Sequence, residues 1–107
     1  MLVSIVVRKK EIGKVIYCDN IWLKLKGLMF TKDPPYGAIL FNVNSIHMFF
    51  VFSPLRIFWL DKDLRVLKKE IALPWRLYSY EKAVHVLELP ISKGREIKEG
   101  DKINIKR

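Results

Sequence analysis

The sequence predicts a mainly β protein. We expect a single domain over residues 1–107, built as a β-sandwich or open barrel of about eight short strands with at most one short helix. Apolar and polar residues alternate with a period of two along most of the chain, which is the pattern of half-buried strands. Short turn-forming stretches separate these segments. Half of the 107 residues are hydrophobic, enough for a core without disulfide or metal staples.

The first third of the chain contains two predicted strands and one short predicted helix. Alternation predicts strands over Leu2–Arg8 and Ile12–Tyr17, joined by a charged turn. Over Asp19–Gly27 we favour one or two helical turns, because Asp or Asn can cap the start of a helix and Gly its end. The alternation there also permits a strand. Thr31–Gly37 is predicted as a loop, since its two prolines lack backbone donors.

The middle of the chain raises the question of a membrane segment. Eleven of the eighteen residues in NSIHMFFVFSPLRIFWLD, residues 44–61, are apolar. A spanning helix needs about 20 mostly apolar residues, and the longest unbroken apolar run here is Met48–Phe52. We predict instead two core strands, Ile46–Phe52 and Leu55–Leu60, separated at Ser53–Pro54, where proline removes a donor and restricts its neighbour.

Four more strands complete the predicted sheets, over Ala38–Val43, Leu64–Ile71, Ala83–Leu89 and Lys102–Lys106. Asp61–Asp63 is a turn, so the strands on its two sides form a hairpin. Lys98–Asp101 is the turn before the last strand. Pro74–Tyr80, with the sequence PWRLYSY, is predicted as an aromatic loop.

The net charge of +9 raises nucleic acid or an anionic surface as a partner. Against this, most basic residues are scattered, and runs such as Arg8–Lys10 and Lys68–Lys69 are short. Fourteen Lys, one Thr and no Gln resemble the composition of proteins from hyperthermophiles. We therefore favour a solvated, lysine-coated surface over a nucleic-acid footprint.

The cysteine count and the N-terminus indicate a cytoplasmic protein. Cys18 is the single cysteine, which excludes an internal disulfide and fits a reducing compartment. With two His besides, a thiolate-rich zinc site is excluded in a monomer, and we expect no metal and no cofactor. The first ten residues carry their charges after their apolar run, the wrong order for a secretory signal. We expect no contact with a membrane.

Three polar residues fall within predicted core strands. His47 lies among apolar residues, and we favour a buried or half-buried neutral imidazole bonded to backbone over a ligand-binding or catalytic role. The strand phase places Glu88 on an apolar face, where an ionised carboxylate is costly unless a cation pairs with it. Arg56 shares a strand face with apolar residues as well, where a buried cation is costly unless an anion pairs with it. Glu88 is therefore expected either at a wet strand end or paired with Arg56, Arg76 or His47.

The loop at 74–80 concentrates Trp75, Arg76 and Tyr78. Aromatic side chains beside an arginine suit stacking on a sugar, a base or a peptide. The simpler alternative is that Trp75 and Tyr78 fold back as a lid over the open end of the sheet, because large aromatic side chains are usually mostly buried.

Several runs of the sequence are similar, in order and spacing, to those of a known family: Lys26–Phe30, Gly37–Phe41, Ile46–Val66, Pro74–Tyr78, Val86–Pro90 and Gly100–Ile103. Together they resemble the Domain of Unknown Function 192 family over nearly the whole chain, as an archaeal-type member without a signal peptide. The resemblance implies a small, mainly β domain of jelly-roll-like sandwich topology. It implies no activity, because the family has none established.

The chain departs from that family at two places. Many members carry Trp-Met-Lys-Asn-Thr where this chain has His47–Val51, and Asp where it has Arg56. Apolar side chains thus replace the polar ones that a site there would use. Glu88 matches the Leu-Glu-Leu pattern of the family, and Gly100–Asp101 matches its Gly-Asp turn.

Three functions remain open from the sequence. The first, which we favour, is a non-catalytic binding module that presents an aromatic and basic cleft to a small polar ligand such as a carbohydrate. Its candidate ligand-binding residues are His47, Arg56, Trp75, Arg76, Tyr78 and Glu88. The second is a hydrolase-type enzyme using His47 and Glu88. The third is a charge-driven nucleic-acid binder.

Overall fold

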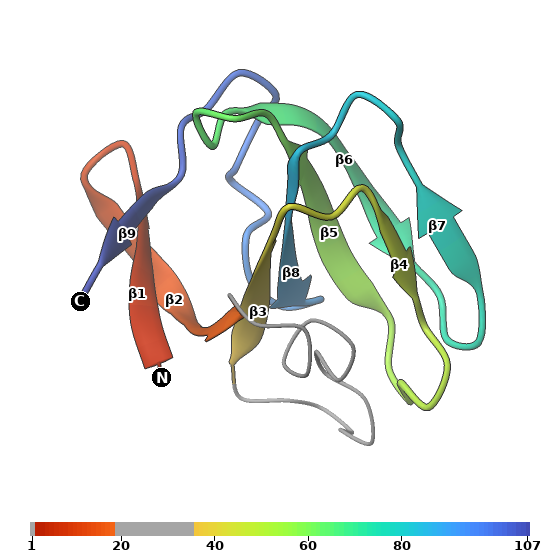
Figure 1. Cartoon of the computed structure of the whole chain (residues 1–107). Helices are drawn as coiled ribbons and strands as arrows, with labels where there is room; N and C mark the ends of the chain where they lie inside the picture. The colour runs from red at the N-terminus through yellow and green to blue at the C-terminus, as the bar shows by residue number, and fades with distance from the viewer. Residues whose placement is uncertain (1, 19–35) are drawn as a thin grey trace.

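Nine strands form two sheets in the computed structural model, which describes residues 2–18 and 36–107 (Figure 1). The strands are β1 (Leu2–Val7), β2 (Lys10–Cys18), β3 (Gly37–Phe41), β4 (Ser45–His47), β5 (Leu55–Leu60), β6 (Val66–Ala72), β7 (Leu77–Ser79), β8 (His85–Pro90) and β9 (Asn104–Lys106). The described part of the chain contains no helix, so the predicted mainly β class is confirmed. The helix expected at Asp19–Gly27 lies outside the described residues.

The larger sheet has seven strands in the order β6-β5-β8-β3-β2-β1-β9. Its neighbours are antiparallel except β2 and β3, which run parallel. The sheet curls so that its two ends approach: the amide of Val66 donates to the Asp101 carbonyl (2.9 Å) and that of Ile103 donates to the Leu64 carbonyl (2.9 Å). These bonds join β6 to the segment before β9 without closing a barrel.

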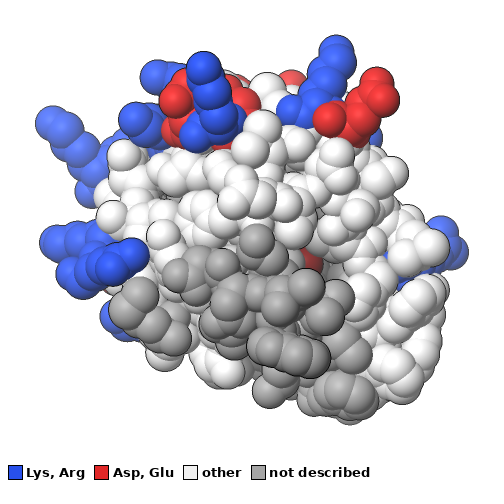
Figure 2. Space-filling view, in the orientation of Figure 1, with Lys and Arg blue, Asp and Glu red and all other residues white. Residues whose placement is uncertain are grey.

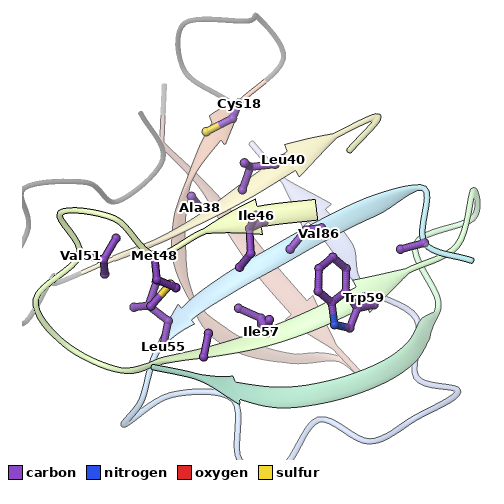
Figure 3. Close-up of a cluster of buried hydrophobic side chains, with 12 residues drawn as sticks. Cys18, Ala38, Leu40, Ile46, Met48, Val51, Leu55, Ile57, Trp59 and Val86 are labelled. Carbon is purple, nitrogen blue, oxygen red and sulfur yellow. The ribbon is translucent and has the colours of Figure 1, made fainter. Parts of the chain in front are cut away.

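The two faces of this sheet cover two separate cores. Leu87 and Leu89 of β8 point into the curl, toward a cluster that includes Phe58. Val86 of β8 points to the opposite face, into a second cluster (Figure 3). This second cluster is closed by the pair β4 and β7, whose Ile46 contributes a buried side chain to it. β8 therefore has a core on both sides, and a polar residue on it has little access to water.

A glycine permits a close contact between β3 and β8. A Cβ atom on Gly37 would lie 2.1 Å from the Glu88 carbonyl oxygen and 2.9 Å from a methyl carbon of Leu89. No real Cβ fits there, so β3 approaches β8 this closely only because residue 37 has no side chain.

Two predicted elements were wrong. The expected strand Ile46–Phe52 ends at His47, and the chain then turns: the Val51 amide donates to the Met48 carbonyl (3.3 Å) and Phe50 has a φ of 61°. The expected loop Pro74–Tyr80 contains strand β7, which pairs with β4. The two errors have one cause, because β4 needs β7 as its partner and neither strand is long enough to show a clear period. No helix in the described residues is long and apolar enough to cross a membrane.

Candidate functional site

Two loops meet at one end of the β4–β7 pair (Figure 1). They are the connection from β4 to β5, residues 48–54, and the connection from β6 to β7, residues 73–76. The Met48 amide donates to the Arg76 carbonyl (2.7 Å), and the Trp75 amide donates to the Met48 carbonyl (2.8 Å). Met48 itself is fully buried, so the contact between the loops is anchored to the core.

Five rings, four on these loops and one at the end of β4, contact one another, and we call them the aromatic tip: His47, Phe49, Phe50, Phe52 and Trp75. Trp75 is central, with its ring centroid 5.0 Å from that of Phe50, 6.4 Å from that of Phe52 and 6.5 Å from that of Phe49. The imidazole of His47 stacks on Phe49 at 5.4 Å. The rings thus form one connected surface instead of separate side chains.

The aromatic tip is open to solvent. Trp75 is 52% exposed, and Phe49, Phe50 and Phe52 are 40%, 43% and 47% exposed. Leu77, the first residue of β7, is 71% exposed. Contiguous apolar surface of this kind is uncommon on a soluble domain and marks contact sites for partners, ligands or membranes. In the alternative predicted for Trp75, a lid folded over the sheet, the ring would be mostly buried. The ring is 52% exposed, so that alternative is wrong for Trp75.

The backbone holds two of these rings in an unusual conformation. Phe50 and Trp75 have φ angles of 61° and 67°, in the left-handed region that bulky residues rarely adopt. Each such residue costs of order 1–3 kcal/mol, and such strain clusters at functional sites. Between the exposed rings, Met48 and Val51 are buried and fix the loop.

Arg76 and Tyr78, two of the predicted site residues, support the tip. Tyr78 is half-buried against the second core, and its hydroxyl oxygen accepts a hydrogen bond from the Leu73 amide (2.8 Å). This bond fixes the loop that carries Trp75. Arg76 is exposed and supplies the carbonyl that receives the Met48 amide.

His47 faces outward from the core. Its sequence neighbours Ile46 and Met48 both belong to the buried cluster, whereas its ring stacks on exposed Phe49. It is half-buried, as predicted. Its Nδ1 atom is buried and finds no hydrogen-bond partner in residues 2–18 and 36–107, so the expected bond to backbone is not made by this atom.

Glu88 lies inside the molecule, apart from the tip. Its strand neighbours on either side are Ala38 and Ile57, and with Val86 these belong to the second core. Glu88 is only 5% exposed, so of the two alternatives left open by the sequence, the wet strand end is wrong. None of the described ion pairs includes it. Desolvation by this apolar surrounding raises the pKa of Glu88 to about 7.

Arg56 is on the other face of β5. Its guanidinium donates from Nη2 to the Ile91 carbonyl (3.0 Å) and from Nε to the Lys93 carbonyl (3.1 Å). It therefore ties β5 to the segment after β8 and is not a partner of Glu88. Of the six predicted site residues, the structure brings His47, Trp75, Arg76 and Tyr78 to one end of the molecule and leaves Arg56 and Glu88 elsewhere.

Sequence reasoning missed Phe49, Phe50, Phe52 and Leu77. The first three were assigned to a buried strand, because an apolar run has the same appearance whether or not another layer covers it. A signal was present nonetheless: the resemblance placed polar residues in this run. Among the described residues, no three His, Cys, Asp or Glu side chains are grouped in a way that would hold a metal ion.

Comparison with known proteins identifies relatives over nearly the whole chain. Residues 4–105 match the DUF192 family, described as Uncharacterized ACR. A UPF0127 protein of Thermococcus kodakarensis is 36% identical over 101 residues, which cover 86% of this chain. The matched region spans 64% of that relative's length.

Two solved structures share the fold. A protein of unknown function from Novosphingobium aromaticivorans superposes with a TM-score of 0.69 at 23% identity, covering 97% of this chain and 84% of that one. A Sinorhizobium meliloti 1021 protein, described as a candidate transcription regulator, superposes with a TM-score of 0.75 at 18% identity, covering 97% and 92%. At these identities the likeness concerns the fold alone.

Proposed function

The chain belongs to the DUF192 family of uncharacterised proteins, and we propose that it is a non-catalytic binding module whose contact surface is the aromatic tip. The observation that carries this proposal is the connected set of exposed rings around Trp75. Leaving so much apolar surface in water forgoes the stabilisation that its burial would supply, about 25 cal/mol for each Å². The strained backbone at Phe50 and Trp75 adds to that cost. A partner that covers the rings recovers this free energy.

The partner favoured by the tip has an apolar surface. Phe49, Phe50 and Phe52 offer no hydrogen-bonding group, whereas a carbohydrate site needs several polar groups around its stacking ring. The small polar ligand expected from the sequence is therefore less well matched, although Trp75 could stack on a sugar. Tryptophan and other aromatic side chains are also the residues that dominate binding energy in protein interfaces.

Catalysis and nucleic-acid binding are less well supported. His47 and Glu88 lie on different sides of β4, one stacked on an exposed ring and the other within the core. A nucleic-acid surface of this type would place aromatic rings among lysines. Residues 42–55 and 71–75 contain no Lys or Arg. In Figure 2 most basic side chains gather at the top and left, a smaller group lies at the right edge, and the described residues at the lower right, where Figure 1 places the two loops, are white.

Site-specific photo-crosslinking tests the proposal. Benzoylphenylalanine would replace Phe50, which keeps an aromatic ring at the tip, and in a second protein it would replace Leu2, an exposed apolar residue on β1. We expect a discrete crosslinked product in cell extract from position 50, abolished by the additional change Trp75→Ala, and none from position 2. Equal products from both positions would mean that the tip has no special affinity, and the proposal would be wrong.

A further inference from the structure

The pairing of β4 with β7 determines which backbone groups of β7 are free. The Met48 amide donates to Arg76 (2.7 Å) and the Tyr80 amide donates to Asn44 (2.9 Å), and Tyr78 is the residue paired with Ile46 between them. In an antiparallel ladder, residues that exchange hydrogen bonds alternate with residues that do not. On β7, the backbone amide and carbonyl groups of the even-numbered residues therefore point toward β4.

The alternate residues, Leu77 and Ser79, direct their amide and carbonyl groups to the opposite side. Ser79 is paired in register with Ser45 and Leu77 with His47, the positions that do not exchange hydrogen bonds. In the described structure β7 is an edge strand of the two-stranded sheet, and Leu77 and Ser79 are both exposed. The outer edge of β7 thus presents two donors and two acceptors without a strand to receive them.

We propose that this edge binds an extended peptide segment of a partner protein, which adds as a strand to β7 and places an apolar side chain on the aromatic tip. This inference rests on the proposed function and names the partner of the same surface. Leu77 begins the edge and is separated from Trp75 by a single residue, so a peptide paired along β7 runs directly onto the rings. Backbone bonds supply affinity and the ring surface supplies specificity.

The positive charge of the chain favours acidic residues on both sides of the bound segment of that peptide. The protein has a net charge of +9, and residues 42–60 and 71–80 contain no Asp or Glu. Arg76 is exposed beside the edge. A peptide with acidic residues beside its apolar side chain is attracted at long range, and its association would weaken as salt rises.

The free edge favours a peptide over the two other occupants of an apolar surface. Leu77 and Ser79 are two residues apart, and a strand repeats its outward groups at about 6.6–6.8 Å. A lipid headgroup or acyl chain does not reproduce that spacing. A second copy of the chain does, but it carries the same charge of +9 and is repelled.

A peptide selection with two matched variants tests the inference. The probe is a phage-displayed library of random unstructured peptides, selected on the intact chain. Ser79→Pro removes an outward amide while leaving the bonds to β4, and Ser45→Pro makes the same change on the outer edge of β4. We expect enriched peptides with alternating apolar residues and acidic flanks. They should bind Ser79→Pro about tenfold more weakly, as expected for a lost hydrogen bond and a blocked edge, and Ser45→Pro unchanged.

A second measurement guards against misfolding of the proline variant. The best peptide, N-methylated at alternate amides, should lose binding to the unmodified protein in one methylation register and keep it in the other. Peptides that lose binding to Trp75→Ala but bind Ser79→Pro normally would refute the pairing of the peptide with the edge of β7. The aromatic tip alone would then be the contact surface. If the selection fails and phosphatidylglycerol vesicles bind through Trp75, the inference is wrong and the surface contacts a membrane. If the selection fails and the protein forms dimers that Ser79→Pro dissociates, the inference is wrong and the surface binds a second copy of the chain.

Discussion

Replacing Glu88 with glutamine should stabilise the protein at neutral and alkaline pH. Glu88 lies between Ala38 and Ile57 in an apolar core, and none of the described ion pairs compensates its charge. Burial raises its pKa from the ordinary 4.5 to about 7. At about 1.36 kcal/mol for each pKa unit, this corresponds to about 3 kcal/mol of stability that the ionised carboxylate removes.

The pH window follows from the direction of the change. Between about pH 4.5 and about pH 7 the folded protein holds a proton that the unfolded chain has released. The free energy of unfolding therefore falls as the pH rises through this range and levels off above it. Glu88→Gln has no proton to lose at this site, so its advantage over the parent should grow by about 3 kcal/mol across the range, or roughly 12–24 °C in Tm.

Guanidinium unfolding followed by circular dichroism, over a series of pH values, measures this difference. Glu81→Gln makes the same chemical change on an exposed turn and should shift the free energy of unfolding by less than about 0.5 kcal/mol at every pH. The reasoning fails if Glu88→Gln is less stable than the parent by about 3–5 kcal/mol at neutral pH, because that result means a cation pairs with the buried carboxylate.

Two further predictions concern the sheet and its turn. Gly37→Ala should lower the free energy of unfolding by about 3 kcal/mol or more, since its Cβ would meet the Glu88 carbonyl at 2.1 Å; Gly13→Ala, whose Cβ meets only the flexible end of Lys93 at 3.4 Å, is the control in the same denaturation assay, and equal effects would refute the steric reason. Asp101 accepts a bond from the Lys98 amide (2.8 Å) and pairs with Arg8, and both interactions hold its pKa below the ordinary 3.8. Asp101→Asn should therefore lower Tm at neutral pH, with the difference vanishing as the pH falls through the pKa of the folded protein, and an equal loss at all pH values would contradict this assignment.

The strands that sequence reasoning placed well are those with local boundaries. β5, Leu55–Leu60, was predicted with both ends correct, because Pro54 and Asp61 bound a clear apolar run. Strand phase in the same way placed Glu88 on an apolar face, although it left open whether the carboxylate was buried there or wet at the strand end. In both cases the information lies within a few residues of the element.

The aromatic tip could not be predicted because it depends on which surface another layer covers. The run from Met48 to Phe52 contains buried and exposed apolar residues side by side, and only the turn at Phe50 separates them. Periodicity reports the spacing of apolar residues, but it does not report whether another layer of the protein buries them. Likewise, the partner of Arg56 is a pair of backbone carbonyls at Ile91 and Lys93, about which no side-chain pattern carries information.

The most direct test of the central claim is the stability of Trp75→Gly. If the ring is a contact surface for a partner, its loss removes few buried contacts, and glycine relieves the strain of a φ of 67°. We predict that the free energy of unfolding changes by less than about 1 kcal/mol, whereas Trp59→Ala, at a fully buried tryptophan of the same chain, costs about 3–5 kcal/mol. A loss of about 3–5 kcal/mol at Trp75 as well would show that the ring is part of the core, and the aromatic tip would then have a structural role in place of a binding one.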